Sequence, residues 1–205
     1  FLAGGAGNDR LLGGAGNDTL GASEAFGGTA PETGSDTLLG GAGDDTVNMI
    51  GAAAIDALDW IAGGAGNDVL RIHDLVGEAA LAALDRVTGF ESVTILGNSF
   101  GAILRIGDGL ADSAETPLSV FAQGAFAVVL DASAVTSSGV ELRRGPALRA
   151  DTLIGGGGAD TIEAGFGATS VFGGGGDDLL TNVRSTLTAA GARFAGGAGR
   201  DTLTF

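Results

Sequence analysis

The chain has 205 residues, 44% of them hydrophobic and 40 of them glycine, and it contains no cysteine. The length allows a sizeable core, the glycine content without a Gly-X-Y period excludes collagen and favours repeated tight turns, and disulfides and thiolate metal sites are excluded. The formal charge of −15, from 25 acidic and 10 basic side chains, argues against nucleic acid as a partner and favours cations.

A nine-residue unit recurs through the first third of the chain: two glycines, any residue, glycine, any residue, aspartate, any residue, a large aliphatic residue and any residue. Complete copies begin at Gly4, Gly13, Gly40 and Gly63. An interrupted copy begins at Gly27, and a copy without glycines keeps only the aspartate and the aliphatic residue. The aspartates of this block are Asp9, Asp18, Asp36, Asp45, Asp59 and Asp68.

The glycine loops are missing from residues 72–148. Apolar runs separated by Gly, Asp and Ser, such as FGAILRIG and LSVFAQGAFAVVLDASAV, predict short strands that continue a solenoid with wider turns. A separate globular insertion is the alternative. The stretch LVGEAALAALD, residues 75–85, predicts a short helix or cap.

The unit returns in the last quarter, so we divide the chain into residues 1–71, 72–148 and 149–205. The aspartates of this second block are Asp151, Asp160, Asp178 and Asp201. One loop has Thr169 in place of the carboxylate, and we expect it to be a poor ion ligand. No apolar run is long enough to span a bilayer. Because no leader begins the chain, we expect a piece of a longer polypeptide.

The repeat resembles the GGxGxDxUx nonapeptide of RTX proteins, which type I secretion systems export from Gram-negative bacteria. More weakly, DASAVTSSG and GFESVTI resemble the C-terminal part of alanine-rich bacterial S-layer proteins. The RTX resemblance covers about half of the chain and implies an all-β fold, a parallel β-roll or β-helix solenoid with calcium bound between stacked glycine-rich loops.

Calcium takes six to eight oxygen ligands in flexible geometry, which two stacked loops of carbonyls and carboxylates can supply. We therefore expect several Ca²⁺ ions, held by the ten aspartates named above together with backbone carbonyls of the complete loops. The loop residues expected to contribute are Gly40, Ala42, Gly63, Ala65, Gly155, Gly157, Gly173 and Gly175. The alternative is that the aspartates only form turns.

Two units make one turn of such a roll, so each loop stacks on the next loop but one. Counting loops places Asp9, Glu24, Asp45 and Asp68 on one side and Asp18, Asp36 and Asp59 on the other. The best site is expected between the loops of Asp45 and Asp68, and a second between those of Asp160 and Asp178. Asp151 faces the Thr169 loop, where we expect a weak site or none.

The aliphatic position of each unit is expected to point inward and form ladders. These residues are Leu11, Leu20, Leu38, Val47, Ile61, Leu70, Leu153, Ile162, Val171, Leu180 and Leu203. Open ends of a solenoid expose strand edges, so we expect neighbouring copies or further repeats of the same chain there.

These features favour a calcium-dependent structural module, not an enzyme, that is secreted or at the bacterial cell surface and serves in a surface layer, adhesin or extracellular assembly. Cell-surface polysaccharide is a candidate partner. An exported polysaccharide lyase or epimerase is the alternative, with candidate residues Arg71, His73, Asp74, Arg86 and Arg105. Ice binding would need a regular threonine ladder, which the recurring Thr19, Thr37, Thr46, Thr152, Thr161 and Thr202 do not provide; they are expected to be strand formers.

Overall fold

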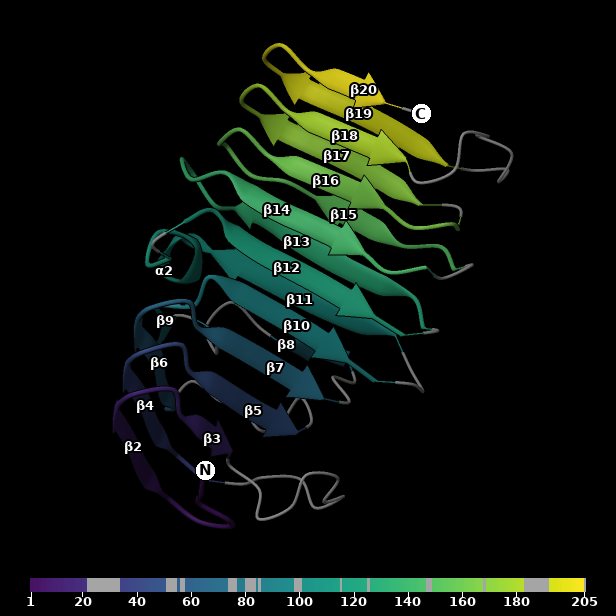
Figure 1. Ribbon diagram of the computed structural model, residues 1–205. Coiled ribbons are helices and arrows are strands. Elements are labelled where there is room, and N and C mark those ends of the chain that lie inside the picture. The colour runs from purple at the N-terminus through teal and green to yellow at the C-terminus, as the bar shows by residue number, and fades with distance from the viewer. Residues whose placement is uncertain are drawn as a thin grey trace.

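The computed structural model describes residues 1–21, 34–50, 55, 58–73, 77–79, 84, 86–97, 101–114, 116–124, 126–146, 149–167, 169–182 and 192–204. These residues form a parallel β-solenoid with almost no helix, in which successive turns of the chain stack along one axis (Figure 1). The predicted all-β solenoid is confirmed.

One sheet runs the whole length of the solenoid and contains ten of the described strands, all paired in parallel. Its strands, in order, are β1 (Leu2–Ala3), β3 (Thr19–Gly21), β5 (Thr46–Ile50), β7 (Val69–His73), β10 (Ser92–Leu96), β12 (Leu118–Gln123), β14 (Val140–Arg144), β16 (Thr161–Ala164), β18 (Leu179–Asn182) and β20 (Thr202–Thr204).

Two further parallel sheets complete the described turns. A four-stranded sheet contains β2 (Arg10–Ala15), β4 (Thr37–Ala42), β6 (Trp60–Ala65) and β9 (Val87–Thr88). A six-stranded sheet contains β8 (Gly77–Ala79), β11 (Ala102–Gly107), β13 (Val128–Ala134), β15 (Thr152–Ile154), β17 (Ser170–Gly175) and β19 (Arg193–Ala198). A four-residue helix, α2 (Asp108–Ala111), lies on the side of the solenoid between β11 and β12 (Figure 1).

The ten-stranded sheet continues through the segment that lacks glycine loops, because β10, β12 and β14 pair between β7 and β16. The division at residues 71 and 148 stays a prediction. The helix or cap predicted over residues 75–85 is wrong for Gly77–Ala79, which pair with β11, whereas Leu84 is helical. Sheet pairing overrides the local helix propensity of this alanine-rich stretch. Residues 75, 76, 80–83 and 85 lie outside the described residues.

The core consists of ladders of aliphatic side chains, one from each turn. In the ten-stranded sheet the register aligns Leu20, Val47, Leu70, Val93, Val120, Leu142, Ile162 and Leu180, all buried. The predicted inward residues are buried, with one exception. Leu203 continues the register of Leu180 but is 41% exposed, because no described turn packs over β20.

Candidate metal centre

Loops that lead into the ten-stranded sheet lie one above another, and we call them the first loop column. In the first block these loops end at Asp18, Asp45 and Asp68. The backbone N–H of Asp18 donates to Oδ1 of Asp45, and that of Asp45 donates to Oδ1 of Asp68, both at 2.7 Å. Asp45 and Asp68 thus each use one carboxylate oxygen to hold the preceding loop of the stack.

The second block repeats this arrangement. The N–H of Asp160 donates to Oδ1 of Asp178 at 2.8 Å, and the N–H of Asp178 donates to Oδ1 of Asp201 at 3.2 Å. The predicted pairings of Asp45 with Asp68 and of Asp160 with Asp178 are therefore confirmed as stacking partners.

Loops that leave the ten-stranded sheet form the second loop column. The N–H of Asp9 donates to Oδ1 of Asp36 at 2.8 Å, and that of Asp36 donates to Oδ1 of Asp59 at 2.7 Å. The prediction that placed Asp9 with Asp45, and Asp18 with Asp36, is wrong. Asp9 and Asp36 are 27 residues apart and stack directly on each other, so the GASE segment with Glu24, which the count treated as a loop, does not add half a turn. Glu24 lies outside the described residues.

In the first block, the second carboxylate oxygen, Oδ2, of several aspartates is available to bind a cation. Oδ2 of Asp9, of Asp45 and of Asp68 is buried and has no hydrogen-bond partner. A buried carboxylate oxygen without a partner is costly, because it has lost water and gained nothing in exchange. A cation bound there would remove this cost.

Glycine leaves room for a second oxygen beside each of these carboxylates. A methyl group on Gly40 would collide with both Oδ2 of Asp45 and the carbonyl oxygen of Gly63 in the next loop. The space at Gly63 is bounded in the same way by Oδ2 of Asp68 and the carbonyl of Gly89. A carboxylate of one loop and a carbonyl of the next therefore meet at the same point in successive turns.

The residues predicted to supply carbonyl ligands differ in the contacts that the structure shows for them. The carbonyls of Gly40, Gly63 and Gly173 lie beside the preceding loop of the first column. Those of Ala42 and Ala65 accept hydrogen bonds from Gly16 and Gly43 at 2.7 and 2.9 Å, which leaves one lone pair each. For Gly157 and Gly175 the structure shows the N–H groups, which donate to Val135 and Gly156. For Gly155 it shows the N–H group, which donates to the Phe172 carbonyl.

Stacking raises the pKa of several carboxyl groups in the first column. Burial raises the pKa of Asp68, and the charges of Asp45 and Glu91 raise it further. Burial, with a smaller contribution from Asp178, raises the pKa of Asp160 to about 6. The pKa of Asp178 is also raised, by burial and then by its acidic neighbours. The folded stack thus resists holding several negative charges at once, and a bound cation would offset them.

The loop of residues 155–160 differs from the other complete loops. The N–H of Gly156 donates to Oδ2 of Asp160 at 2.6 Å, so both oxygens of this carboxylate have partners. In the loop of residues 40–45 the equivalent glycine, Gly41, has a φ of 119°, and Gly156 does not have this positive φ. Gly156 and Gly157 pack on Val135 and Thr136, which belong to a turn without the repeat. In the second block the open oxygen is therefore Oδ2 of Asp178.

Asp151 is committed to other partners. Its Oδ1 accepts from the N–H of Val128 at 2.8 Å, and its Oδ2 accepts from Nε of Arg144 at 3.1 Å. Burial raises its pKa, and these two partners oppose that rise. The loop of Thr169 stacks beside it, as predicted, since Thr152 pairs with Ser170. The expected weakness of this site has a second cause that the repeat pattern does not show, namely the guanidinium of Arg144.

Glu91 is a site residue that the repeat pattern misses. Its Oε2 accepts from the N–H of Asp68 at 2.7 Å, which is the role of the next aspartate elsewhere in the column. Nine residues separate Ile61 from Leu70, whereas six separate the equivalent Val87 from Val93. The longer side chain of glutamate spans the shorter turn. The signal in the sequence is the GFES stretch, which has one glycine and an acidic residue before a strand.

The described residues of the enzyme alternative do not all lie on one element. Arg71 and His73 lie on β7, Arg105 lies on β11 and is bonded to Asp131 at 2.9 Å, and Arg86 donates to the carbonyl of Leu58. Strands β7 and β11 belong to different sheets, and Arg86 lies in the turn before β9 of the third sheet. Asp74 lies outside the described residues. The recurring threonines begin strands, and the ladder from Thr19 to Thr46 is interrupted by Val69, as the sequence predicts.

The donor set therefore consists of carboxylate and carbonyl oxygens, without nitrogen or sulfur, and this fits a hard cation such as calcium. Among the described residues no group of three or more Asp, Glu or His side chains forms a conventional metal cluster. No helix in the described part of the chain is long and apolar enough to cross a membrane. Fold and site together define a cation-binding, parallel β-solenoid module.

The family comparison makes this class specific. A family model of the RTX calcium-binding nonapeptide repeat matches four copies, at residues 1–23, 32–48, 56–71 and 148–180. The chain therefore contains RTX calcium-binding nonapeptide repeats, as its glycine and aspartate pattern indicates, and the solenoid that they form is a calcium-binding structural module. Searches of curated proteins and of solved structures gave no match.

Proposed function

We propose that this chain is the calcium-folded structural module of a secreted bacterial protein, and that it serves in a surface layer, an adhesin or another extracellular assembly. The observation that carries this proposal is the buried Oδ2 of Asp45, which has no partner and faces the carbonyl oxygen of Gly63 in the next loop. We assign the best calcium site to the loops of Asp45 and Asp68. In the second block we assign the corresponding site to Oδ2 of Asp178 and the Gly196 carbonyl, in place of the predicted site between the loops of Asp160 and Asp178, because both carboxylate oxygens of Asp160 have partners.

The charge of the chain supports folding outside the cell. With a formal charge of −15, the chain repels itself in the compact state when no cation is bound. Extracellular calcium modules bind with dissociation constants of about 0.1 to 1 mM. In the cytosol, where free calcium is far lower, the glycine-loop blocks of such a chain stay unfolded, which suits export; outside, calcium binding supplies the free energy of their folding.

Assembly through the ends of the solenoid is part of the proposal. The side chain of Leu203 is 41% exposed on β20, at the edge of the ten-stranded sheet. A further repeat or a second copy that added a strand there would bury this side chain and pair the open backbone groups of the edge.

A calcium titration tests the proposal. The protein is freed of metal with a chelator, and far-ultraviolet circular dichroism is recorded as calcium is added, with magnesium as the control ion. We expect a cooperative gain of β-structure at about 0.1 to 1 mM calcium and little change with magnesium, which dehydrates reluctantly. An ellipticity that is fully β at zero calcium and indifferent to calcium would show that the aspartates only form turns.

A further inference from the structure

Arg144 occupies a position in the core that other turns give to apolar side chains. It ends β14 and pairs in register with Ala122, in the inner ladder that also contains Ile72 and Ile95. Its side chain has no exposed surface, and neither has that of its ion-pair partner Asp151. A buried charge in such a place is strongly destabilising unless it is fully paired and hydrogen-bonded.

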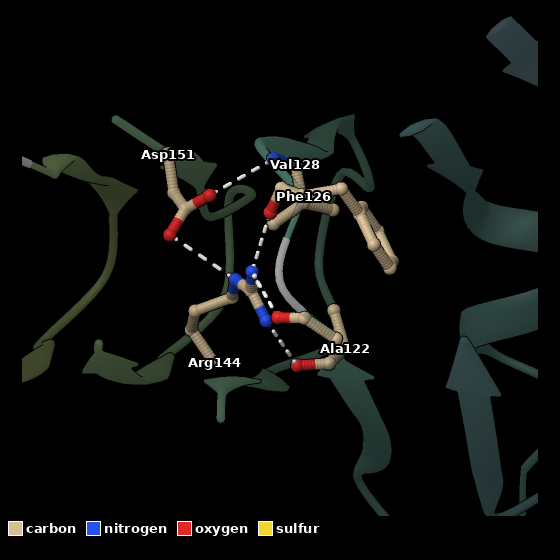
Figure 2. A network of polar contacts seen from close by, with 6 residues as sticks. Ala122, Phe126, Val128, Arg144 and Asp151 are labelled. Carbon is tan, nitrogen blue, oxygen red and sulfur yellow. Dashed lines mark hydrogen bonds and ion pairs between the residues drawn. The ribbon is translucent and has the colours of Figure 1, made fainter. Parts of the chain in front are cut away.

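The guanidinium group meets that condition (Figure 2). Nε donates to Oδ2 of Asp151 at 3.1 Å, and Nη1 donates to the carbonyl of Ala122 at 2.9 Å. Nη2 donates to the carbonyls of Gly124 at 3.0 Å and of Phe126 at 2.6 Å. Four of the five N–H donors therefore have partners. The cation also lies 5.6 Å from the centroid of the Phe126 ring, within the range of a cation–π contact.

The oxygen atoms around Arg144 come from two stacked turns. Three carbonyls belong to residues 122–126, which follow or end β12, and the carboxylate of Asp151 belongs to the turn that follows β14. Carbonyls and a carboxylate from successive turns are also what the first loop column offers a cation, although there the carboxylate belongs to the earlier turn and the carbonyl to the later one. Both oxygens of Asp151 already have partners here, whereas Oδ2 of Asp45 and of Asp68 has none.

We infer that Arg144 takes the place of a calcium ion in this turn, so that β12, β13 and β14 remain folded when calcium is absent. The comparison with calcium rests on the proposed function, whereas the stabilising role of Arg144 rests on its own contacts. The centre of the solenoid then serves as a folded template. On calcium binding, the glycine loops on either side add their turns to strands that already exist, which avoids the cost of starting a new sheet.

Hydrogen exchange followed by mass spectrometry on the 205-residue chain tests this inference, in chelator and in about 10 mM calcium, which is at least about tenfold above the expected dissociation constants. In chelator we expect peptides from residues 118–144 to be protected, while those from residues 37–50 and 170–182 exchange like an unfolded chain. Calcium should then slow exchange in the two outer regions. Absence of central protection in chelator would overturn the inference.

Arg144→Met removes the charge and keeps most of the length. We expect central protection in chelator to fall at least about 100-fold, because Asp151 is left buried and unpaired. Arg143→Met is the matched control, since Arg143 is adjacent, 48% exposed and paired with Glu163 on the outer face. Its effect should stay below about fivefold. Equal effects of the two substitutions would overturn the role of Arg144.

Two further outcomes separate the possibilities. If Arg144→Met does not fold at any calcium concentration, Arg144→Lys decides: retention of more central protection than in the Met variant supports the need for a cation, and no difference from the Met variant refutes it. If the outer peptides of the unsubstituted chain ignore calcium while the centre depends on Arg144, the proposed function fails and the stabilising role of Arg144 stands.

Discussion

The backbone N–H of Asp45 lies 2.7 Å from Oδ1 of Asp68, one full turn further along the chain. One oxygen of the Asp68 carboxylate therefore fixes the stack, and the other, Oδ2, is buried without a partner. The same side chain thus has a structural part and a part available to a cation, and the two can be separated by substitution.

Asp68→Asn should do so. The amide keeps an oxygen for the N–H of Asp45 but removes the charge and replaces the second oxygen with an NH₂ group. We expect the calcium midpoint of folding to rise at least about tenfold, since ligand charge sets calcium affinity. Calcium titration by circular dichroism measures this midpoint.

Asp44→Asn is the control, because Asp44 is exposed. Its Oδ1 accepts from the N–H of Asn67, and in the preceding loop an asparagine, Asn17, accepts from the N–H of Asp44 in the same way. An unchanged midpoint for Asp68→Asn, or an equal shift for both variants, would contradict the assignment.

Gly63→Ala tests the space beside the same carboxylate. A methyl group there would collide with Oδ2 of Asp68 and with the carbonyl of Gly89. We expect a loss of about 1 to 3 kcal/mol in the unfolding free energy in saturating calcium, together with weaker calcium binding. Urea unfolding and isothermal titration calorimetry measure the two effects. Ala127→Ser, at an exposed position outside the glycine loops, should change neither. Full calcium affinity in Gly63→Ala would exclude this space from the site.

Acid should partly replace calcium. The pKa of Asp160 is raised from 3.8 to about 6 in the folded chain. Between these values the folded state holds a proton that the unfolded state has released, so the unfolding free energy falls as pH rises through this window. In metal-stripped buffer, Asp160 alone should make the second block about 1 kcal/mol more stable at pH 5 than at pH 7.

Ellipticity and urea unfolding at the two pH values measure this difference, and Asp160→Asn should reduce it. A metal-free chain that loses β-structure between pH 7 and pH 5 would contradict the direction of the effect.

The ladder of buried aliphatic side chains that contains Leu70 should contribute most of the unfolding free energy when calcium is bound. Leu70 is fully buried between Val47 and Val93, so Leu70→Ala should cost about 2 to 5 kcal/mol. Leu12 is 49% exposed on the outer face of β2, and Leu12→Ala should change stability by no more than about 0.5 kcal/mol. Urea unfolding in saturating calcium compares the two. A loss of similar size in both variants would mean that the ladder is not the core.

Periodicity predicts the parts of this fold that depend on local sequence. The aliphatic residue two places after each aspartate, such as Leu70, faces inward because strand side chains alternate and the turn fixes where the strand begins. Leu203 breaks the rule only because nothing described packs over it.

The remaining features depend on contacts between distant turns. The loop columns are misassigned for Asp9 and Asp18, because the repeat pattern does not show whether extra residues enlarge a turn or add a new one. Glu91 escapes the pattern because its turn is three residues shorter. The pattern also misses Arg144, because an arginine at the end of an apolar strand is predicted to be exposed unless the carbonyl groups around it are known.

The spacing of the hydrogen-bonded loops has a geometric consequence. A full turn takes 27 residues between Asp18 and Asp45, 23 between Asp45 and Asp68, and 18 between Asp160 and Asp178. Each nevertheless advances the stack by one strand, about 4.8 Å. The length of the solenoid therefore depends on the number of turns and not on the number of residues in each turn. Its ten strands span roughly 43 Å however long the connecting loops are. Residues inserted in the loops between strands widen the solenoid and leave its length unchanged.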